Sequence, residues 1–180
     1  MEDKTIISEC QKANPKYQKI LLEKYSDYLA SAARNYMSDK ESIMDVLQDT
    51  WIIIFKNINK YEEKGYFYAW AKRIMLREII RMSKKEKAKV LFLDTLGRKN
   101  NSIQPDVERK LELQEALILV ERIPSPSREV FKMFVIEGLP HKEIAQLMGI
   151  KESTSRVHLT NARKRLNQFL SVQDQRKVKL

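Results

Sequence analysis

The sequence is poor in the residues that form turns and cross-links. Its 180 residues include one cysteine, four glycines and five prolines. A single thiol, Cys10, excludes a disulfide framework and a cysteine-cluster zinc site, and we expect it to be a buried small apolar side chain. So few turn-forming residues leave little material for a fold of many short strands. The composition therefore predicts an all-α protein.

The sequence also lacks a long apolar stretch. No segment approaches the roughly 20 apolar residues that a membrane-spanning helix needs, and no apolar signal segment opens the chain. We therefore expect a cytoplasmic protein that does not insert into a membrane.

Residue patterns of common enzymes are missing as well. The two histidines, His141 and His158, stand 17 positions apart, without an HExxH motif or a carboxylate cluster at ligand spacing. There is no glycine-rich phosphate-binding loop. We expect His141 at the surface near a helix start, and His158 at the surface or facing a DNA groove. The sequence predicts no metal, no cofactor and no enzyme activity, which disfavours a small basic nuclease.

Positive charge is concentrated in two segments. The chain has a net charge of +10, and segments 66–90 and 151–180 each hold eight basic and two acidic residues. The rest of the chain is therefore slightly acidic. The basic segments indicate a nucleic-acid partner, and the acidic remainder leaves room for a protein partner.

Segment 138–166 has the pattern of a helix-turn-helix. Pro140 suits the first turn of a helix, Gly149 suits its stop, and Ser153 suits the cap of a second helix. Apolar residues at spacings of three and four form the inner face of the second helix: Leu159, Ala162 and Leu166. The opposite face offers side chains to a major groove: Arg156, Val157, Thr160, Asn161 and Lys164.

Two helices with different surfaces are predicted in the N-terminal half. The first follows a cap at Ser38 or Asp39, and its outer face carries Asp45, Gln48, Asp49 and Ile52. The second begins near Phe67 after a polar break and interleaves aromatic with basic residues, which suits unpaired bases and phosphates. We assign Phe67 and Trp70 to the core. The better candidates for base stacking are Tyr61, Tyr66 and Tyr68.

Segment 91–107 loses helical periodicity and contains glycine, proline and asparagine, which is typical of a flexible linker. We therefore predict two small helical domains, 1–90 and 108–170, joined by this linker and followed by a basic tail, 171–180. A linker of about 17 residues spans up to roughly 56 Å, or about 16 base pairs of DNA. Such a linker can join domains that bind two separated DNA elements.

The motifs together resemble a known family. EIAQLMGI and TSRVHLTNARKRL resemble the C-terminal DNA-binding region of bacterial RNA polymerase sigma factors of the sigma-70 family, in particular the extracytoplasmic-function (ECF) group. DVLQDTWIIIFKNI resembles the family helix that docks on the clamp helices of the polymerase's largest subunit. FYAWAKRIMLREIIRMSKKEK resembles the region that opens and reads the −10 promoter element. The resemblance covers both domains in family order.

The resemblance implies three sets of site residues. Those expected to bind the polymerase are Asp45, Gln48, Asp49, Trp51 and Ile52. Those expected to contact the −10 element and the melted strand are Asn57, Lys60, Tyr61, Tyr66, Lys72, Arg73, Arg77, Arg81 and Lys84. Those expected on the recognition helix for the −35 element are Lys151, Ser153, Thr154, Arg156, Val157, His158, Thr160, Asn161, Arg163 and Lys164. Ser155 departs from the family pattern, because many members have an apolar residue there.

The function that the resemblance implies is that of an alternative sigma factor. Such a protein binds core RNA polymerase, double-stranded promoter DNA and the melted non-template strand, and directs promoter-specific initiation. Whether an anti-sigma factor is a further partner stays open, as do the promoter sequence and the inducing signal. The alternative is a stand-alone helix-turn-helix regulator, which would usually dimerise on a palindromic site.

Overall fold

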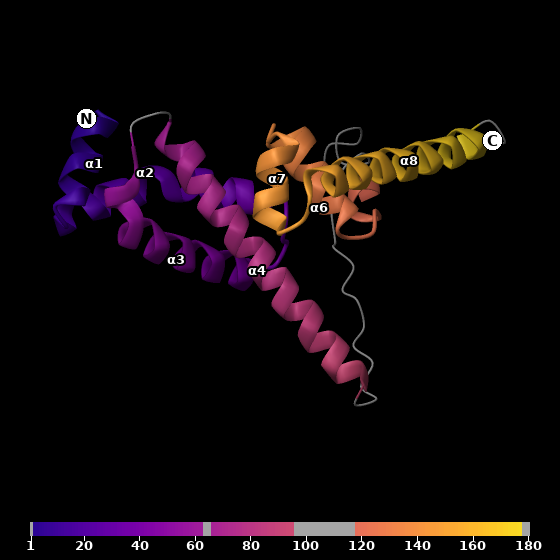
Figure 1. The fold of residues 1–180 in the computed structure, drawn as a ribbon, viewed down its shortest axis with the longest axis horizontal. Helices are drawn as coiled ribbons and strands as arrows, with labels where there is room; N and C mark the ends of the chain where they lie inside the picture. Colours follow the sequence, from indigo (N-terminus) through magenta and orange to yellow (C-terminus); the bar gives the residue numbers. More distant parts are fainter. Residues whose placement is uncertain (1, 63–65, 96–117, 178–180) are drawn as a thin grey trace. The chain divides into compact units, whose positions relative to one another are not determined.

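The computed structural model describes residues 2–62, 66–95 and 118–177, except for the side chains of 86–95 and 172–177. Every regular element in these ranges is a helix (Figure 1). The chain forms two compact units, Met1–Ile103 and Gln104–Leu180. The prediction of an all-α protein with two small domains is confirmed.

The N-terminal unit contains α1 (Asp3–Gln11), α2 (Pro15–Ala33), α3 (Lys40–Asn57), the short 3-10 helix η1 (Ile58–Lys60) and α4 (Phe67–Thr95). The start of α2 is capped by the Asn14 side chain, which accepts a hydrogen bond from the backbone N–H of Lys16. At the start of α3, Asp39 accepts from the backbone N–H of Ser42 at 2.8 Å. These hydrogen bonds satisfy N–H groups that a helix start leaves free. Hydrogen bonds from the Ser42 side chain and then from its backbone N–H lower the pKa of Asp39.

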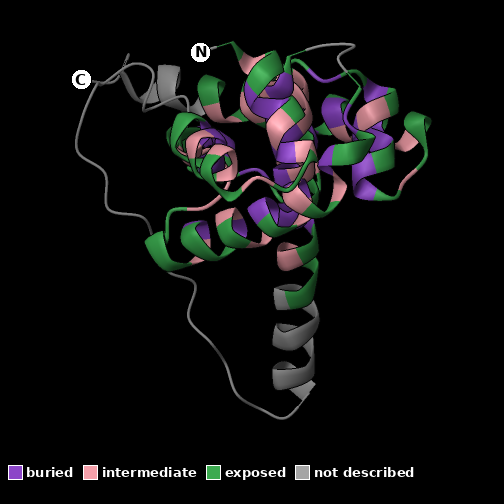
Figure 2. Cartoon of the chain, turned by 90° about the vertical axis from the view of Figure 1, so that its left-hand side faces the viewer, coloured by how far each residue is buried: buried purple, intermediate pink, exposed green. Residues whose placement is uncertain are grey.

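The core of this unit lies where α2 packs against α3 and α4. It is built from fully buried aliphatic side chains, which include Leu21, Leu29, Val46, Ile54 and Met75. Buried positions, purple in Figure 2, line the sides on which helices meet, and exposed positions lie on the opposite sides. Cys10 is buried as expected, and burial raises the pKa of its thiol to about 11.

The helix α4 runs five residues past Val90, where the linker was predicted to begin. The reason is compositional, since the first glycine or proline after Phe67 is Gly97. The remainder of the predicted linker and the predicted helix from Glu108 to residue 117 lie outside the described residues.

The C-terminal unit contains a helical turn at 118–121, α6 (Ser127–Phe131), the π-helix η2 (Lys132–Ile136), α7 (His141–Met148) and α8 (Glu152–Lys177). Its core joins the 118–123 segment to α6 and α8 through Val120, Ile123, Phe131 and Ala162. The backbone of α8 continues into the predicted tail as far as Lys177, because the chain after Gly149 holds no glycine or proline.

The buried hydroxyl of Thr50 allows a test of how the core of the N-terminal unit is packed. Thr50 of α3 is completely buried, and its hydroxyl has no hydrogen-bond partner among the described residues. Thr50→Val removes this hydroxyl while keeping the shape of the side chain. We expect the free energy of unfolding to rise by about 1 kcal/mol, measured by urea denaturation of the full chain. Thr50→Ala is the control and should lower it, because it leaves a cavity. A loss with Val as large as with Ala would contradict this interpretation.

Candidate nucleic-acid and partner interfaces

The outer side of α3 forms a continuous exposed face. Asp45 and Gln48 are exposed, and Ile52 is 44% exposed. Met44, 60% exposed, extends this face and was not predicted. Its spacing of four from Gln48 and of eight from Ile52 was the signal available in the sequence. We call Met44, Asp45, Gln48 and Ile52 the α3 face; it combines two exposed apolar side chains, Met44 and Ile52, with one amide and one carboxylate.

Trp51 does not lie on the α3 face. Its side chain is buried, its indole N–H donates to Ser26 Oγ at 3.1 Å, and its ring stacks on Phe55 with centroids 5.5 Å apart. The helical pattern had placed Trp51 on the inner side of α3, whereas the family resemblance had placed it among the polymerase contacts. The packing agrees with the pattern, so Trp51 holds α3 against α2 and does not present itself to a partner.

The Asp49 side chain forms an ion pair within the N-terminal unit. Its carboxylate accepts a hydrogen bond from Arg81 Nη2 of α4 at 2.9 Å, and Arg81 Nε donates to Glu78 at 2.6 Å. The Glu78 side chain is 9% exposed, whereas those of Asp49 and Arg81 are about half exposed. Glu78 and then Asp49 raise the pKa of Arg81. This three-residue cluster ties α3 to α4, so a predicted polymerase contact and a predicted DNA contact pair with each other.

The outer side of α4 carries a basic stripe. Arg73, Arg77 and Lys84 are exposed, and their spacing of four and seven positions keeps them on one side of the helix together with Arg81. Lys72 is half-buried, and its ammonium lies 5.3 Å from the centroid of the Tyr68 ring. A row of exposed cations along one helix is suited to a phosphate backbone.

The tyrosines beside the 61–66 loop differ sharply in exposure. Tyr61 is only 9% exposed and packs against Phe67 and Trp70, with ring centroids 5.6 Å and 5.3 Å away. Tyr66 is 86% exposed. Before the loop, Lys60 is exposed, and the Asn57 side chain donates to the Ile53 carbonyl at 2.9 Å. Tyr61 therefore belongs to the core, and Tyr66 is the residue of this pair with an open ring.

In the C-terminal unit, α7 and α8 form the predicted helix-turn-helix. Gly149 ends α7 with φ +67°, a left-handed conformation that favours glycine. Leu159 and Ala162 are buried and Leu166 is half-buried, so the predicted inner face of α8 is correct. Since α8 begins at Glu152, Ser153 lies inside the first turn and is not the cap.

Most predicted recognition residues face solvent. The exposed ones are Lys151, Ser153, Arg156, Val157, Thr160, Asn161, Arg163 and Lys164. Thr154 and His158 are half-buried, and His158 Nδ1 lies 3.2 Å from the hydroxyl of Ser127 in α6. His158 therefore braces α8 against α6 and does not project from the exposed side. Arg156 pairs with Glu152 at 2.6 Å, one turn earlier on the same helix.

The expectation that His141 lies at the surface is wrong. His141 is buried, its ring stacks on Phe134 with centroids 4.6 Å apart, and its Nδ1 lies 2.9 Å from Ser155 Oγ. Burial, and then the charge of Arg156, lower the pKa of His141. Its spacing from Ile144 and Met148 was the overlooked signal, because positions three and seven apart share one helix side. Ser155, the departure from the family pattern, is fully buried and is the partner of this histidine.

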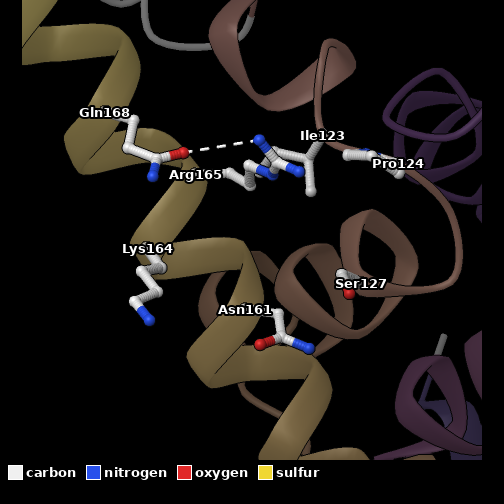
Figure 3. Close-up of a pocket in the computed structure, with 7 residues that line it drawn as sticks. All are labelled: Ile123, Pro124, Ser127, Asn161, Lys164, Arg165 and Gln168. Carbon is white, nitrogen blue, oxygen red and sulfur yellow. Dashed lines mark hydrogen bonds between the residues drawn. The ribbon is translucent and has the colours of Figure 1, made fainter.

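A hollow of about 460 Å³ lies between the start of α6 and the predicted recognition helix α8. Figure 3 shows the residues that line it: Ile123, Pro124, Ser127, Asn161, Lys164, Arg165 and Gln168. Arg165 donates to Gln168 Oε1 at 3.4 Å across this wall. Polar and apolar surfaces contribute about equally to the hollow, Lys164 and Arg165 give it positive charge, and two of the predicted DNA contacts, Asn161 and Lys164, line it.

The described part of the chain holds neither a metal-binding cluster nor a membrane-spanning helix. No group of three or more His, Cys, Asp or Glu side chains there is arranged to hold a metal ion. None of the helices there combines the length and apolarity required to cross a bilayer.

Comparison with known families decides the relationship. Residues 21–89 match the model of sigma-70 region 2, and residues 113–166 match the model of sigma-70 region 4. The two matches follow the family order and together cover more than half of the chain. The chain belongs to the sigma-70 family of RNA polymerase sigma factors. The predicted family is thereby confirmed, and its ECF group is supported by the relatives that follow.

The relatives of this sigma-70 family member are distant but match along most of their length. The RNA polymerase sigma factor NccH of Alcaligenes xylosoxydans xylosoxydans is 23% identical, over 83% of this chain and 84% of the relative. The ECF RNA polymerase sigma-E factor of Haemophilus influenzae is 20% identical, over 91% and 92%. The sigma factor RpoE of Bartonella quintana, solved with the anti-sigma factor NepR, gives a TM-score of 0.59 at 22% identity, over 86% and 96%. This last likeness shows a shared fold.

Because Tyr61 is buried and Tyr66 is exposed, their replacement by alanine should affect the free energy of unfolding differently. Tyr61→Ala should lower the free energy of unfolding by about 3 kcal/mol, because it empties a site between two aromatic rings. Tyr66→Ala should change it by less than about 0.5 kcal/mol, because the ring is open to solvent. Urea denaturation of the two variants measures both values. Equal stability of the two variants would show that Tyr61 is not a core residue.

Proposed function

We propose that this protein is an alternative sigma factor of the ECF type, which binds core RNA polymerase and directs promoter-specific transcription initiation. The observation that carries the proposal is the pairing of two basic surfaces, on α4 and α8, that lie in two separate units in the order of sigma-70 regions 2 and 4. A protein that reads two separated DNA elements needs this arrangement, whereas a regulator of one site does not.

The α3 face is the proposed contact with the polymerase. Its two apolar side chains, Met44 and Ile52, are exposed on the same face as Asp45, and the resemblance assigns this helix to the clamp helices of the largest subunit. Interfaces take most of their affinity from a few apolar anchors surrounded by polar groups. Met44 and Ile52 are suited to be anchors, while Asp45 and Gln48 are suited to set the orientation. Asp49 contributes indirectly through its pairing with Arg81.

The two DNA surfaces have different tasks in this proposal. The exposed side of α8 enters a major groove at the −35 element, where Arg156 and Asn161 reach base edges and Lys164 contacts phosphate. On α4, Arg73, Arg77 and Lys84 hold the backbone of the melted non-template strand, and Tyr66 stacks on an unpaired base. The chain itself performs no catalysis, because the polymerase carries out the synthesis.

Regulation by a partner protein is part of the proposal. The similar sigma factor of Bartonella quintana was solved with the anti-sigma factor NepR. We extend this mode of control, and a location in the cytoplasm with the polymerase, to the present chain.

The first test asks whether the α3 face binds core polymerase. The variant Asp45→Ala, Gln48→Ala, Ile52→Ala should weaken binding to core polymerase about tenfold or more, because it removes an anchor and its polar neighbours. It leaves Asp49 and its ion pair intact. The matched control is Glu23→Ala, Asp27→Ala, Leu22→Ala, three exposed positions of α2. The measurements are pull-down of core enzyme and run-off transcription on a randomised promoter library.

Two outcomes of this test would count against the proposal. If the wild-type chain yields no promoter-specific transcript with core polymerase, the protein is not a sigma factor. If it binds one palindromic site specifically and as a dimer without core polymerase, the stand-alone regulator is the correct function.

A second test separates base reading from phosphate binding on α8. Arg156→Ala should relax base preference at one or two upstream positions, at a cost of about 1–3 kcal/mol for a bidentate base contact. Its pair with Glu152 is exposed and contributes little, so the fold should persist. Lys164→Ala should weaken binding to all sequences alike and make the salt dependence shallower. Selection from the promoter library at two salt concentrations measures both effects, and identical profiles would refute the division of tasks.

A further inference from the structure

An exposed aromatic residue stands on α2, outside every surface assigned so far. Tyr28 is 63% exposed, although α2 buries its other side in the core. Its ring lies 6.4 Å from the ring of Tyr25 and 6.2 Å from that of Tyr68 on α4. Tyr28 is thus the outermost ring of a cluster that bridges two helices.

The ring beneath Tyr28 is firmly held. Tyr25 is buried, its hydroxyl donates to the carboxylate of Asp3, and its ring lies 5.1 Å from Phe67. These contacts tie α1 and the start of α4 to the same point of α2. The supporting ring is therefore fixed on several sides, and the Tyr28 ring beside it is open to solvent.

A cation borders the same cluster. The ammonium of Lys72 lies 5.3 Å from the centroid of the Tyr68 ring, and the exposed Arg73 follows in sequence. Tyr68 stands two positions after Tyr66, at the beginning of α4. We call Tyr28, Tyr68 and Lys72 the tyrosine platform. The platform extends the surface formed by the basic stripe of α4 and the 61–66 loop, and its Tyr28 adds a residue of α2 to that surface.

We infer that the tyrosine platform binds single-stranded DNA, with an unpaired base stacked on Tyr28 and the adjoining phosphate held by Lys72. Open aromatic rings beside cations are the general device for binding single strands, since every base has a stacking face and every nucleotide a phosphate. A single exposed tyrosine is common on protein surfaces and indicates no ligand. Here, however, the rings of Tyr28 and Tyr68 come together from different helices, and the ammonium of Lys72 lies over the Tyr68 ring. The inference rests on the proposed function and extends its strand-binding surface from α4 to α2.

The charge next to the platform favours nucleic acid over a protein partner. On α4 the exposed cations Arg73 and Arg77 follow Lys72, and they outnumber the exposed carboxylate of Asp27, which adjoins Tyr28 on α2. Lys72 of the platform directly precedes Arg73 of the basic stripe in sequence, so a phosphate backbone that follows the stripe toward the start of α4 passes beside the platform. A protein partner with an acidic segment is the competing occupant, and the experiment distinguishes the two.

The test measures binding of the full-length chain to two fluorescein-labelled probes. One is a twelve-nucleotide thymidine strand; the other has the same length and phosphates but abasic sugars. Tyr28→Ala should raise the Kd for the thymidine strand roughly 5- to 150-fold, the range expected for one stacked base. It should leave the Kd for the abasic strand unchanged. Tyr28→Phe should bind both probes like the wild type, since it keeps the ring.

A matched control on α2 tests whether the effect is specific to the Tyr28 ring. Leu22→Ala removes an exposed apolar side chain from the same helix and should change neither Kd. A second strand with 5-iododeoxyuridine should cross-link to the peptide that contains Tyr28. The inference is overturned if wild type does not bind the thymidine strand, if Tyr28→Ala binds it unchanged, or if that variant weakens both probes equally. Run-off transcription by the wild type is scored in parallel, so failure of the proposed function is recognised separately.

Discussion

The burial of one apolar side of each helix is the constraint on which both units depend. Each unit has a small core, so the few side chains that fill it cannot be spared for binding. In α3, Val46 and Ile54 are completely buried, and the helical period then leaves Gln48 and Ile52 on the outside. The surface available to a partner is therefore a consequence of the packing: once the inner side is chosen, the outer side follows.

Buried polar contacts add direction to this packing. A buried donor or acceptor must find a partner, and the partner is found only in one relative placement of two helices. Trp51 and Ser26 fix α3 against α2, and His141 and Ser155 fix α7 against α8. The second pair matters for function, because the placement of α8 against α7 decides which of its side chains can reach a groove. Burial and then the charge of Arg156 lower the pKa of His141, which favours the neutral form of its ring.

Several charged residues contribute to the packing of the units, and one of them also lies on a predicted binding surface. Arg81 of the basic stripe is a predicted DNA contact, yet it donates hydrogen bonds to Glu78 and Asp49. Lys132 of the π-helix is a lysine buried in the C-terminal unit, and it pairs with Glu121. Charged groups placed this way stabilise the contact between elements, and the cations that remain exposed are the ones suited to phosphate.

The sequence by itself determined the features that depend on neighbours along the chain. Scarce glycine and proline implied helices, spacings of three and four identified the inner face of α8, and Asn14 and Asp39 cap their helices by contacts within three residues. The tertiary structure alone decided which chemically suitable residues stay accessible. Tyr61 and Tyr66 flank the same loop and look alike in sequence, but only Tyr61 meets Phe67 and Trp70. Likewise, the approach of α2 to α4 joins Tyr28 to Tyr68, forty positions apart. Periodicity specifies the side of a helix on which a residue lies, whereas its exposure depends on which other helix covers that side.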